Sequence, residues 1–334
     1  MLLAGDIGGT KSILALYPDD GDARTPLIQQ RYPSRDFSSL TRLLDAFLAE
    51  HDAIIDAACL AVAGPVVAGK AEATNLSWVV TEQGLRARLG DIPVRLVNDL
   101  QATAYAIPAL TPDDLHTLHP GEPEPQGALA VIAPGTGLGE AYLVWDGGAY
   151  RAYASEGGHT DFAPRNELEI ALLRFLMRRM DHVSYERVCS GVGIPNLYAF
   201  LKDSGYAPEP PWLTQQLLQA DDPTPVIVTA ALKHAPPCPL CAAALDLFIA
   251  ILGAEAGNLA LKALSTGGVY VAGGIPPRIL DALSHGPFMQ NFIRKGRFAD
   301  RLVRMPVHVV LNPNTALIGA ARYGFDLLRG MISS

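Results

Sequence analysis

Two short glycine-rich segments constrain the fold of this chain more than any other feature of its sequence. They are residues 5–11 (GDIGGTK) and residues 135–139 (GTGLG). Each follows an apolar run, and the runs after them, 12–17 and 141–145, have the length and flanking turns of β-strands. A dinucleotide-binding fold or a Walker-type loop places a helix directly after its glycines, and the sequence contains no Gly-Lys-Ser/Thr. Both of these common nucleotide sites are therefore excluded.

A strand–glycine turn–strand unit brings backbone N–H groups close together. Glycine has no Cβ and allows positive φ, so successive N–H groups can converge on an anion. A single turn of this kind is more often an ordinary tight hairpin. Its occurrence in both halves of the chain favours a pair of phosphate-binding hairpins, one in each domain, that face each other across a cleft. This arrangement is typical of the ATPase fold that sugar kinases, actin and Hsp70 share.

The order of predicted elements after each glycine turn is the same: strand, further strand, helix. We expect the other strands at residues 27–32, 57–63, 94–97, 129–132, 150–154, 268–272 and 307–311. We expect helices directly after residue 99 and at 37–48 (N-capped by Asp36), 82–89, 166–180, 184–189, 195–202, 239–264 and 316–328. The pattern predicts an α/β fold that occurs twice in the chain.

The domain boundaries follow from one aperiodic segment and from the last helix. Residues 111–126 are rich in proline and acidic residues and predict a linker. We therefore expect a small α/β domain at residues 1–109, completed by about 313–334, where the last helix returns to it. Residues 110–312 then form a large α/β domain.

The composition limits the classes of partner. The chain has 334 residues, of which 49% are hydrophobic, and a net charge of −8. This composition excludes wholesale disorder and argues against binding to nucleic acid or an anionic membrane surface. The N-terminus has no basic region of a signal peptide, and the apolar stretch at 242–252 is interrupted by Asp246. We therefore expect a cytoplasmic protein that does not associate with membranes.

Polar residues gather in three places that suit a small ligand. Asn98 and Asp99 follow the predicted strand at 94–97, where ligand sites of α/β folds collect, although Asp99 alone could equally cap the next helix. Glu156 and His159 flank two glycines, and together with Glu186 they offer two carboxylates and one imidazole, a set that suits a polyol. Taken singly, His159 is also a candidate metal ligand and Glu186 a surface residue.

Six segments in family order make the chain resemble bacterial ATP-dependent glucokinases of the hexokinase-like sugar kinase superfamily. They are residues 5–11, 98–99, 135–139, 156–164 (EGGHTDFAP), 184–188 (SYERV) and 272–275 (AGGI). The resemblance implies two ribonuclease-H-like domains of the actin/hexokinase type with a cleft between them. It also implies ATP-dependent phosphorylation of D-glucose to glucose 6-phosphate.

The resemblance assigns the sugar site residue by residue. Asp99 would be the catalytic base for the attacking hydroxyl, and Asn98 would bind neighbouring sugar hydroxyls. Glu156, His159 and Glu186 would bind the hydroxyls at the anomeric end of glucose. Asn75 lies where the family has a sugar-contacting loop, although Leu76 replaces the His of some relatives.

The resemblance also assigns the nucleotide site. Asp6 would hold Mg²⁺, through water, because Mg²⁺ usually keeps several waters. Adenosine would lie against Gly273 and Gly274. The phosphates would meet backbone and hydroxyl donors of Gly8, Gly9, Thr10, Gly135, Thr136 and Gly137. Lys11 replaces the Asn usual in the family and is left outside this set.

No structural zinc is expected, because Cys238 and Cys241 form the only C-x-x-C and have no second pair. An iron–sulfur activase built on these two cysteines is a remote alternative. Nearer alternatives are a kinase for another hexose (mannose, fructose or an N-acetylhexosamine) and a non-catalytic sugar sensor on the same fold. The expected partners are a sugar and a nucleotide, and the family suggests a homodimer.

Overall fold

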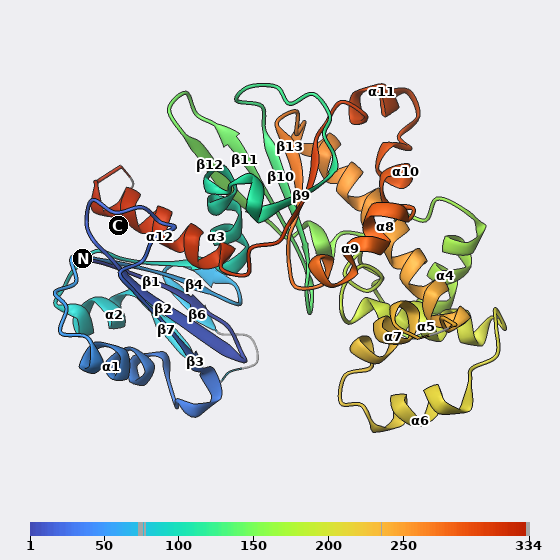
Figure 1. Ribbon diagram of the computed structural model, residues 1–334, viewed down its shortest axis with the longest axis horizontal. Coiled ribbons are helices and arrows are strands. Elements are labelled where there is room, and N and C mark those ends of the chain that lie inside the picture. Colours follow the sequence, from blue (N-terminus) through green and yellow to red (C-terminus); the bar gives the residue numbers. More distant parts are fainter. Residues whose placement is uncertain (73–75, 77, 235, 332–334) are drawn as a thin grey trace. The chain divides into compact units, whose positions relative to one another are not determined.

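The computed structural model describes residues 1–72, 76, 78–234 and 236–331 (Figure 1). The chain forms two compact units. Unit 1 comprises Met1–Asp113, Asp146–Ala154 and Asn312–Ser334, and unit 2 comprises Asp114–Trp145 and Ser155–Leu311. The domain boundaries expected from the sequence differ from these units mainly at residues 146–154, and as limits of domains they stay a prediction.

The first sheet has five strands in the order β3-β2-β1-β4-β8. Strand β1 pairs antiparallel with β2 and parallel with β4, and β4 pairs parallel with β8. The glycine turn therefore joins β1 and β2, as the sequence predicted. The strands are β1 (Leu2–Ile7), β2 (Lys11–Tyr17), β3 (Ile28–Pro33), β4 (Ala57–Val62) and β8 (Val94–Asn98). A small separate sheet consists of β5 (Val66–Val67), β6 (Lys70–Glu72) and β7 (Val79–Thr81).

Helices cover both faces of the five-stranded sheet because its central strands are apolar on both sides (Figure 1). On one face, Leu3 and Ile7 of β1 pack with α1 (Leu40–Glu50) and α2 (Glu82–Leu89). On the other face, Leu2 and Ala4 pack with α3 (Asp99–Ala106) and α12 (Thr315–Leu328). Helices α3 and α12 cross so closely that a Cβ on Gly319 would lie 1.7 Å from the Ala102 carbonyl oxygen.

The second sheet repeats the strand order of the first. Its order is β12-β11-β10-β13-β14-β9, and its β10–β11 pair is antiparallel while the β10–β13 and β13–β14 pairs are parallel. The doubled α/β fold predicted from the sequence is confirmed. The strands are β9 (Leu115–His119), β10 (Leu129–Pro134), β11 (Leu138–Trp145), β12 (Tyr150–Ser155), β13 (Gly268–Val271) and β14 (Val307–Val310).

The core of unit 2 is built around α8 (Pro239–Ala263), which packs against α5, α7 and α10. Among the described residues, α8 is the one helix long and apolar enough to cross a membrane, and 78% of its most apolar stretch is buried inside the structure. It is thus a core helix. The other helices of unit 2 are α4 (Glu167–Met177), α5 (Gly193–Asp203), α6 (Pro211–Gln219), α7 (Pro223–Leu232), α9 (Leu280–His285), α10 (Phe288–Ile293) and α11 (Ala299–Leu302).

Three local predictions were wrong. The linker expected at 111–126 contains the edge strand β9, which pairs with β14 and whose polar side chains hid it from a hydropathy pattern. Helix α1 is capped by Ser39, whose side chain accepts from Arg42 N, and not by Asp36. Residues 184–189 form a turn and not a helix, because backbone N–H groups of this segment bond to the loop at 158–160.

Candidate functional site

In unit 1, two carboxylates lie at the carboxyl ends of parallel strands. Asp6 is the last residue but one of β1, and Asp99 follows β8 directly. Burial and the charge of Asp99 together raise the pKa of Asp6 to about 6, and the charge of Lys11 opposes the shift. Burial also raises the pKa of Asp99, and the hydrogen bond from Leu100 N opposes this. Asp99 is thus close enough to Asp6 to influence its protonation.

Asn98, not Asp99, caps helix α3. Its Oδ1 accepts from Leu100 N at 2.9 Å and from Gln101 N at 3.3 Å, and its Nδ2 donates to Gly64 O at 2.9 Å. Asp99 is the first residue of the helix, and its Oδ1 also accepts from Leu100 N at 2.9 Å. The carboxyl group of Asp99 is also hydrogen-bonded to its own backbone N–H and to the Asn98 side chain.

The glycine turn of unit 1 is held by serine. Gly8 N donates to Lys11 O at 3.1 Å across the turn, and Gly8 O accepts from Ser34 Oγ at 2.6 Å. Ser34 is fully buried, and its hydroxyl also contacts the buried Ser12 hydroxyl at 2.9 Å. These contacts leave Gly9 and Thr10 at the tip of the turn.

The glycine turn of unit 2 is held by a carboxylate and by backbone. Glu186 Oε2 accepts from Leu138 N at 3.0 Å. A Cβ on Gly137 would lie only 2.4 Å from the same oxygen. Gly191 N donates to Gly135 O at 2.8 Å. Thr136 is exposed at the tip of the turn.

Gly273 lies beside the second glycine turn of unit 2. It follows β13 with φ of +88°, and a Cβ there would lie 2.5 Å from Pro134 O, just before the glycine turn. Gly273 and Gly274 are both exposed. The backbone that follows β13 therefore lies directly against the carboxyl end of β10.

The loop at 156–160 lies beside this turn. Gly158 O accepts from Glu186 N at 2.8 Å, and a Cβ on Gly158 would lie 2.1 Å from Leu138 O. Glu156 Oε2 and His159 Nε2 are 3.9 Å apart, with 86% and 58% of their side chains exposed. In unit 2, the loop that carries Glu156 and His159 thus lies beside Glu186 and the second glycine turn.

Several other predicted residues have simple positions. Lys11 is exposed, and Asn75 lies outside the described residues. Cys238 and Cys241 are free and buried in the core of unit 2. No group of three or more His, Cys, Asp or Glu side chains that could hold a metal ion occurs in the described part of the chain.

Two residues that support the site were not expected from the sequence. Ser34 lies 24 residues beyond Thr10 in the chain, and no pattern in the sequence connects it with Gly8. Glu140 is buried beneath the 156–160 loop, although it directly follows the recognised glycines. Only its place in an apolar strand, where a charge is unusual, could have drawn attention to it.

Comparison with known proteins finds close relatives across the whole chain. The family profile described as glucokinase matches residues 3–326. The chain is 43% identical over 335 residues to a glucokinase of Nostoc punctiforme, covering 96% of this chain and 98% of that protein. It is 37% identical to a glucokinase of Cronobacter sakazakii, with 96% of each chain covered.

Two solved glucokinase structures are also similar to this chain. A glucokinase from an Antarctic psychrotroph is 32% identical, with a TM-score of 0.83 over 97% of this chain and 98% of that one. A ROK family glucokinase from Streptomyces griseus, solved with glucose and AMPPNP, shares the fold with a TM-score of 0.61 at 19% identity, over 96% of this chain and 99% of that one.

Proposed function

The chain belongs to the glucokinase family, and we propose that it transfers a phosphoryl group from ATP to D-glucose to give glucose 6-phosphate. The 43% identity to a curated glucokinase over nearly the full length of both chains carries this proposal. The polar groups at the strand ends of both units support it, because they match the needs of phosphoryl transfer to an alcohol.

We assign Asp99 the role of general base. Phosphoryl transfer passes through a loose transition state, so the sugar hydroxyl must be oriented and must lose its proton late. Leu100 N donates to Oδ1 of Asp99, and we assign Oδ2 to accept the proton of the attacking hydroxyl. The raised pKa of Asp99 makes its carboxylate a better base near neutral pH.

The sugar hydroxyls are assigned to groups of both units. In unit 1, the Asn98 side chain, which donates to Gly64 O and is hydrogen-bonded to Asp99, is assigned to a hydroxyl next to the reacting one. In unit 2, Glu186 keeps Oε1 for a hydroxyl, since Oε2 holds Leu138 N. Glu156 and His159 are exposed and adjacent, so they are free to bind two further hydroxyls. Asn75 stays a predicted contact.

The phosphates of ATP are assigned to the tips of the two glycine turns. Gly8, Gly9 and Thr10 belong to the first turn, and Gly135, Thr136 and Gly137 to the second. Backbone N–H groups at such turns bind anions without Lys or Arg, which agrees with the acidic balance of the chain. Gly273 and Gly274, without side chains, offer their exposed backbone to the adenosine.

Asp6 is the residue proposed to hold Mg²⁺. Its carboxylate is the oxygen ligand that Mg²⁺ prefers, and Mg²⁺ sites in kinases usually combine one or two carboxylates with waters and substrate phosphates. When bound there, Mg²⁺ would neutralise charge on the phosphates.

A coupled assay over a grid of hexoses and phosphoryl donors tests the function. We expect glucose with ATP to give the highest kcat/KM. A higher kcat/KM for mannose, fructose or an N-acetylhexosamine would assign a different substrate. Glucose binding without transfer from any donor would assign the chain as a sugar sensor. A homodimer, a cleft that closes on the sugar, and a cytoplasmic location stay predictions.

A further inference from the structure

Glu140 is a buried acid whose place the proposed chemistry does not explain. It lies in β11, directly after the glycine turn, with 1% of its surface exposed. A Cβ on Gly157 would lie 1.9 Å from Glu140 Oε2, so this carboxyl group fills the space directly beneath the 156–160 loop. Glu140 Oε1 is buried and accepts no hydrogen bond from an N–H or O–H group of the described residues. Such a group is costly to bury and is rarely kept without a role.

The partner of Glu140 is a second buried acid. Glu255 lies in the middle of α8 and is 0% exposed, and its carboxyl group lies within hydrogen-bond reach of that of Glu140. Two carboxylates cannot form a hydrogen bond with each other unless one carries a proton. The pair therefore shares one proton, as neighbouring carboxyl groups do when both cannot ionise.

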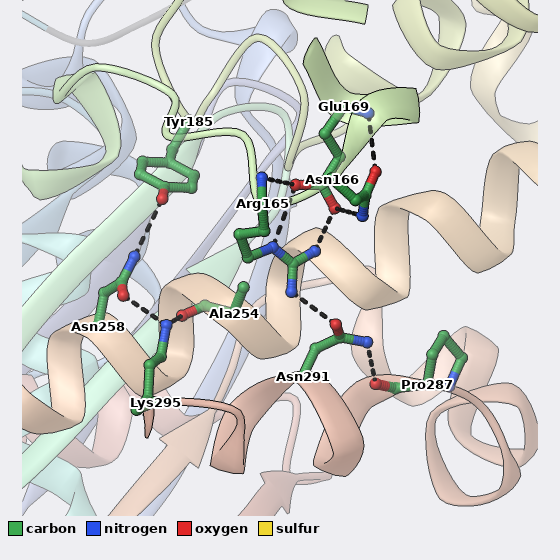
Figure 2. A network of polar contacts seen from close by, with 9 residues as sticks. All are labelled: Arg165, Asn166, Glu169, Tyr185, Ala254, Asn258, Pro287, Asn291 and Lys295. Atoms are coloured by element: carbon green, nitrogen blue, oxygen red, sulfur yellow. Dashed lines mark hydrogen bonds and ion pairs between the residues drawn. The ribbon is translucent and has the colours of Figure 1, made fainter. Parts of the chain in front are cut away.

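The surroundings decide which acid is neutral. Glu255 Oε2 accepts from Asn258 Nδ2 at 2.7 Å, and Glu255 Oε1 lies 3.3 Å from Lys262 Nζ. In Figure 2, Asn258 in turn contacts Lys295 and Tyr185. Donors thus stabilise the charge on Glu255. Burial and the charge of Glu255 hold the pKa of Glu140 well above its usual range, and Lys262 only partly opposes this.

We propose that Glu140 is a positioning residue for the sugar-binding loop, which it supports from below as a neutral acid that donates its proton to Glu255. This inference rests on the proposed function of Glu156 and His159. The upper part of the loop is fixed by Glu186 N on Gly158 O and by Thr160 N on Gly157 O, at 2.8 and 3.0 Å. Glu140 is the support on its inner side.

Ionisation of Glu140 would remove this support. Two like charges would then face each other in a buried place, and the pair would separate. Since Gly157 has no side chain and rests on Oε2, a movement of Glu140 displaces the loop and with it Glu156 and His159. We therefore expect the affinity for the sugar, and not the chemical step, to depend on the protonation of Glu140.

Other ionisable groups face the pair and must be distinguished from it. Lys262 and Lys295 act on Glu255, and burial lowers the pKa of Lys295 to about 8. Tyr185 and Cys189 face Glu255, and their pKa values are raised by burial and by the charge of Glu255. Among these, Lys295 titrates in the range of interest, but it donates to Ala254 O and Asn258 of α8 and not to the sugar-binding loop.

The first experiment measures KM for glucose and kcat from about pH 6 to about pH 9. In the unmodified enzyme we expect KM to rise on the alkaline side, approaching about tenfold for each pH unit above the pKa of Glu140, with a smaller change in kcat. Glu140→Gln imitates the neutral acid and should keep the low KM and lose its alkaline rise. Glu140→Ala should have a high KM at every pH.

Matched variants separate this from other causes. Glu209→Gln removes another nearly buried carboxylate of unit 2, one bound to Lys202 and Tyr198, and should keep the alkaline rise. Lys295→Gln should keep it as well. The proposal is overturned if Glu140→Gln retains the rise in KM, or if Lys295→Gln abolishes it.

The shared proton has its own test, which does not depend on any substrate. A protonated carboxyl group gives a C=O infrared band separate from those of carboxylates, and this band should disappear in Glu140→Gln while the circular dichroism spectrum is kept. If Glu140→Gln does not fold, Glu255→Gln should show the alkaline rise in KM shifted to another pH. Absence of phosphorylation by the unmodified chain would refute the proposed function, whereas an unchanged infrared spectrum in Glu140→Gln would refute the shared proton.

Discussion

The two glycine turns occupy equivalent places in the two sheets but are held by different chemistry. The turn of unit 1 is braced by neutral hydroxyls, with Ser34 Oγ on Gly8 O at 2.6 Å. The turn of unit 2 is braced by a carboxylate, with Glu186 Oε2 on Leu138 N at 3.0 Å. In unit 1 the acids Asp6 and Asp99 instead stand free of the turn, at strand ends. A repeated backbone thus fixes where ligands can bind, and the side chains beneath each turn decide what each half does.

If unit 1 carries the reacting acid and unit 2 the supporting one, their removal should have different effects. Asp99→Asn should keep glucose binding within a few-fold and lower kcat by at least about 10²-fold, because a general base contributes about 10²–10⁴. Glu186→Gln should mainly raise KM. Steady-state kinetics with isothermal titration of glucose measure both.

Asp36→Asn, at an exposed position of unit 1, is the control and should leave kcat unchanged. Near-normal turnover in Asp99→Asn, or an equal loss of kcat in Glu186→Gln, would contradict this division of roles.

The carboxyl group of Asp6 in β1 should also make the stability of the protein depend on pH. The pKa of Asp6 is about 6 in the folded state against 3.8 for the free group, so the folded state binds more protons between these values. Stability should therefore fall as pH rises through this window, by up to about 3 kcal/mol from this group. Urea unfolding at about pH 4 and about pH 7 should show this slope in the unmodified chain and not in Asp6→Asn. Parallel pH curves for the two proteins would count against it.

The effect of the close contact between Gly273 and Pro134 can be measured separately from the effect of positive φ. Gly273→Ala forces positive φ and places a Cβ 2.5 Å from Pro134 O, whereas Gly296→Ala, with φ of +55°, meets nothing within 4 Å. Gly273→Ala should therefore cost at least about 1 kcal/mol more than Gly296→Ala, and should raise KM for ATP. Thermal unfolding and ATP titration compare the two variants. Equal effects would show that the contact with Pro134 carries no weight.

Removal of the hydrogen bond between Ser12 and Ser34 in unit 1 should have the smallest effect of these changes. Ser34→Ala leaves the buried Ser12 hydroxyl without its partner and should cost about 1–2 kcal/mol. The double variant Ser12→Ala/Ser34→Ala should lose less than the sum of the single changes, because both partners of one hydrogen bond are then gone. Denaturant unfolding of the three variants checks this. Strictly additive losses would mean that the two hydroxyls do not act together.

The parts of the fold that the sequence predicted depend on local patterns. The glycine turns, their flanking strands and the long helix α8 are marked by composition and periodicity within a few residues. Strand β9 and the turn at 184–189 were missed because distant partners form them. Strand β9 exists through its pairing with β14, and Tyr185 N donates to Thr160 O at 3.0 Å in place of a helical carbonyl.

The same distinction holds for the site. The sequence by itself was enough to predict the acids and glycines of the candidate site and the doubled order of strands, because short segments of the chain show each of these features. Only the tertiary structure decided that Asn98 caps α3, that Ser34 holds the first turn, and that Glu140 meets Glu255 under Gly157. The physical reason is burial. A carboxyl group has an ordinary pKa in the unfolded chain, and the fold alone brings Glu140 and Glu255, 115 positions apart in the sequence, into one water-poor place where a single proton must serve both.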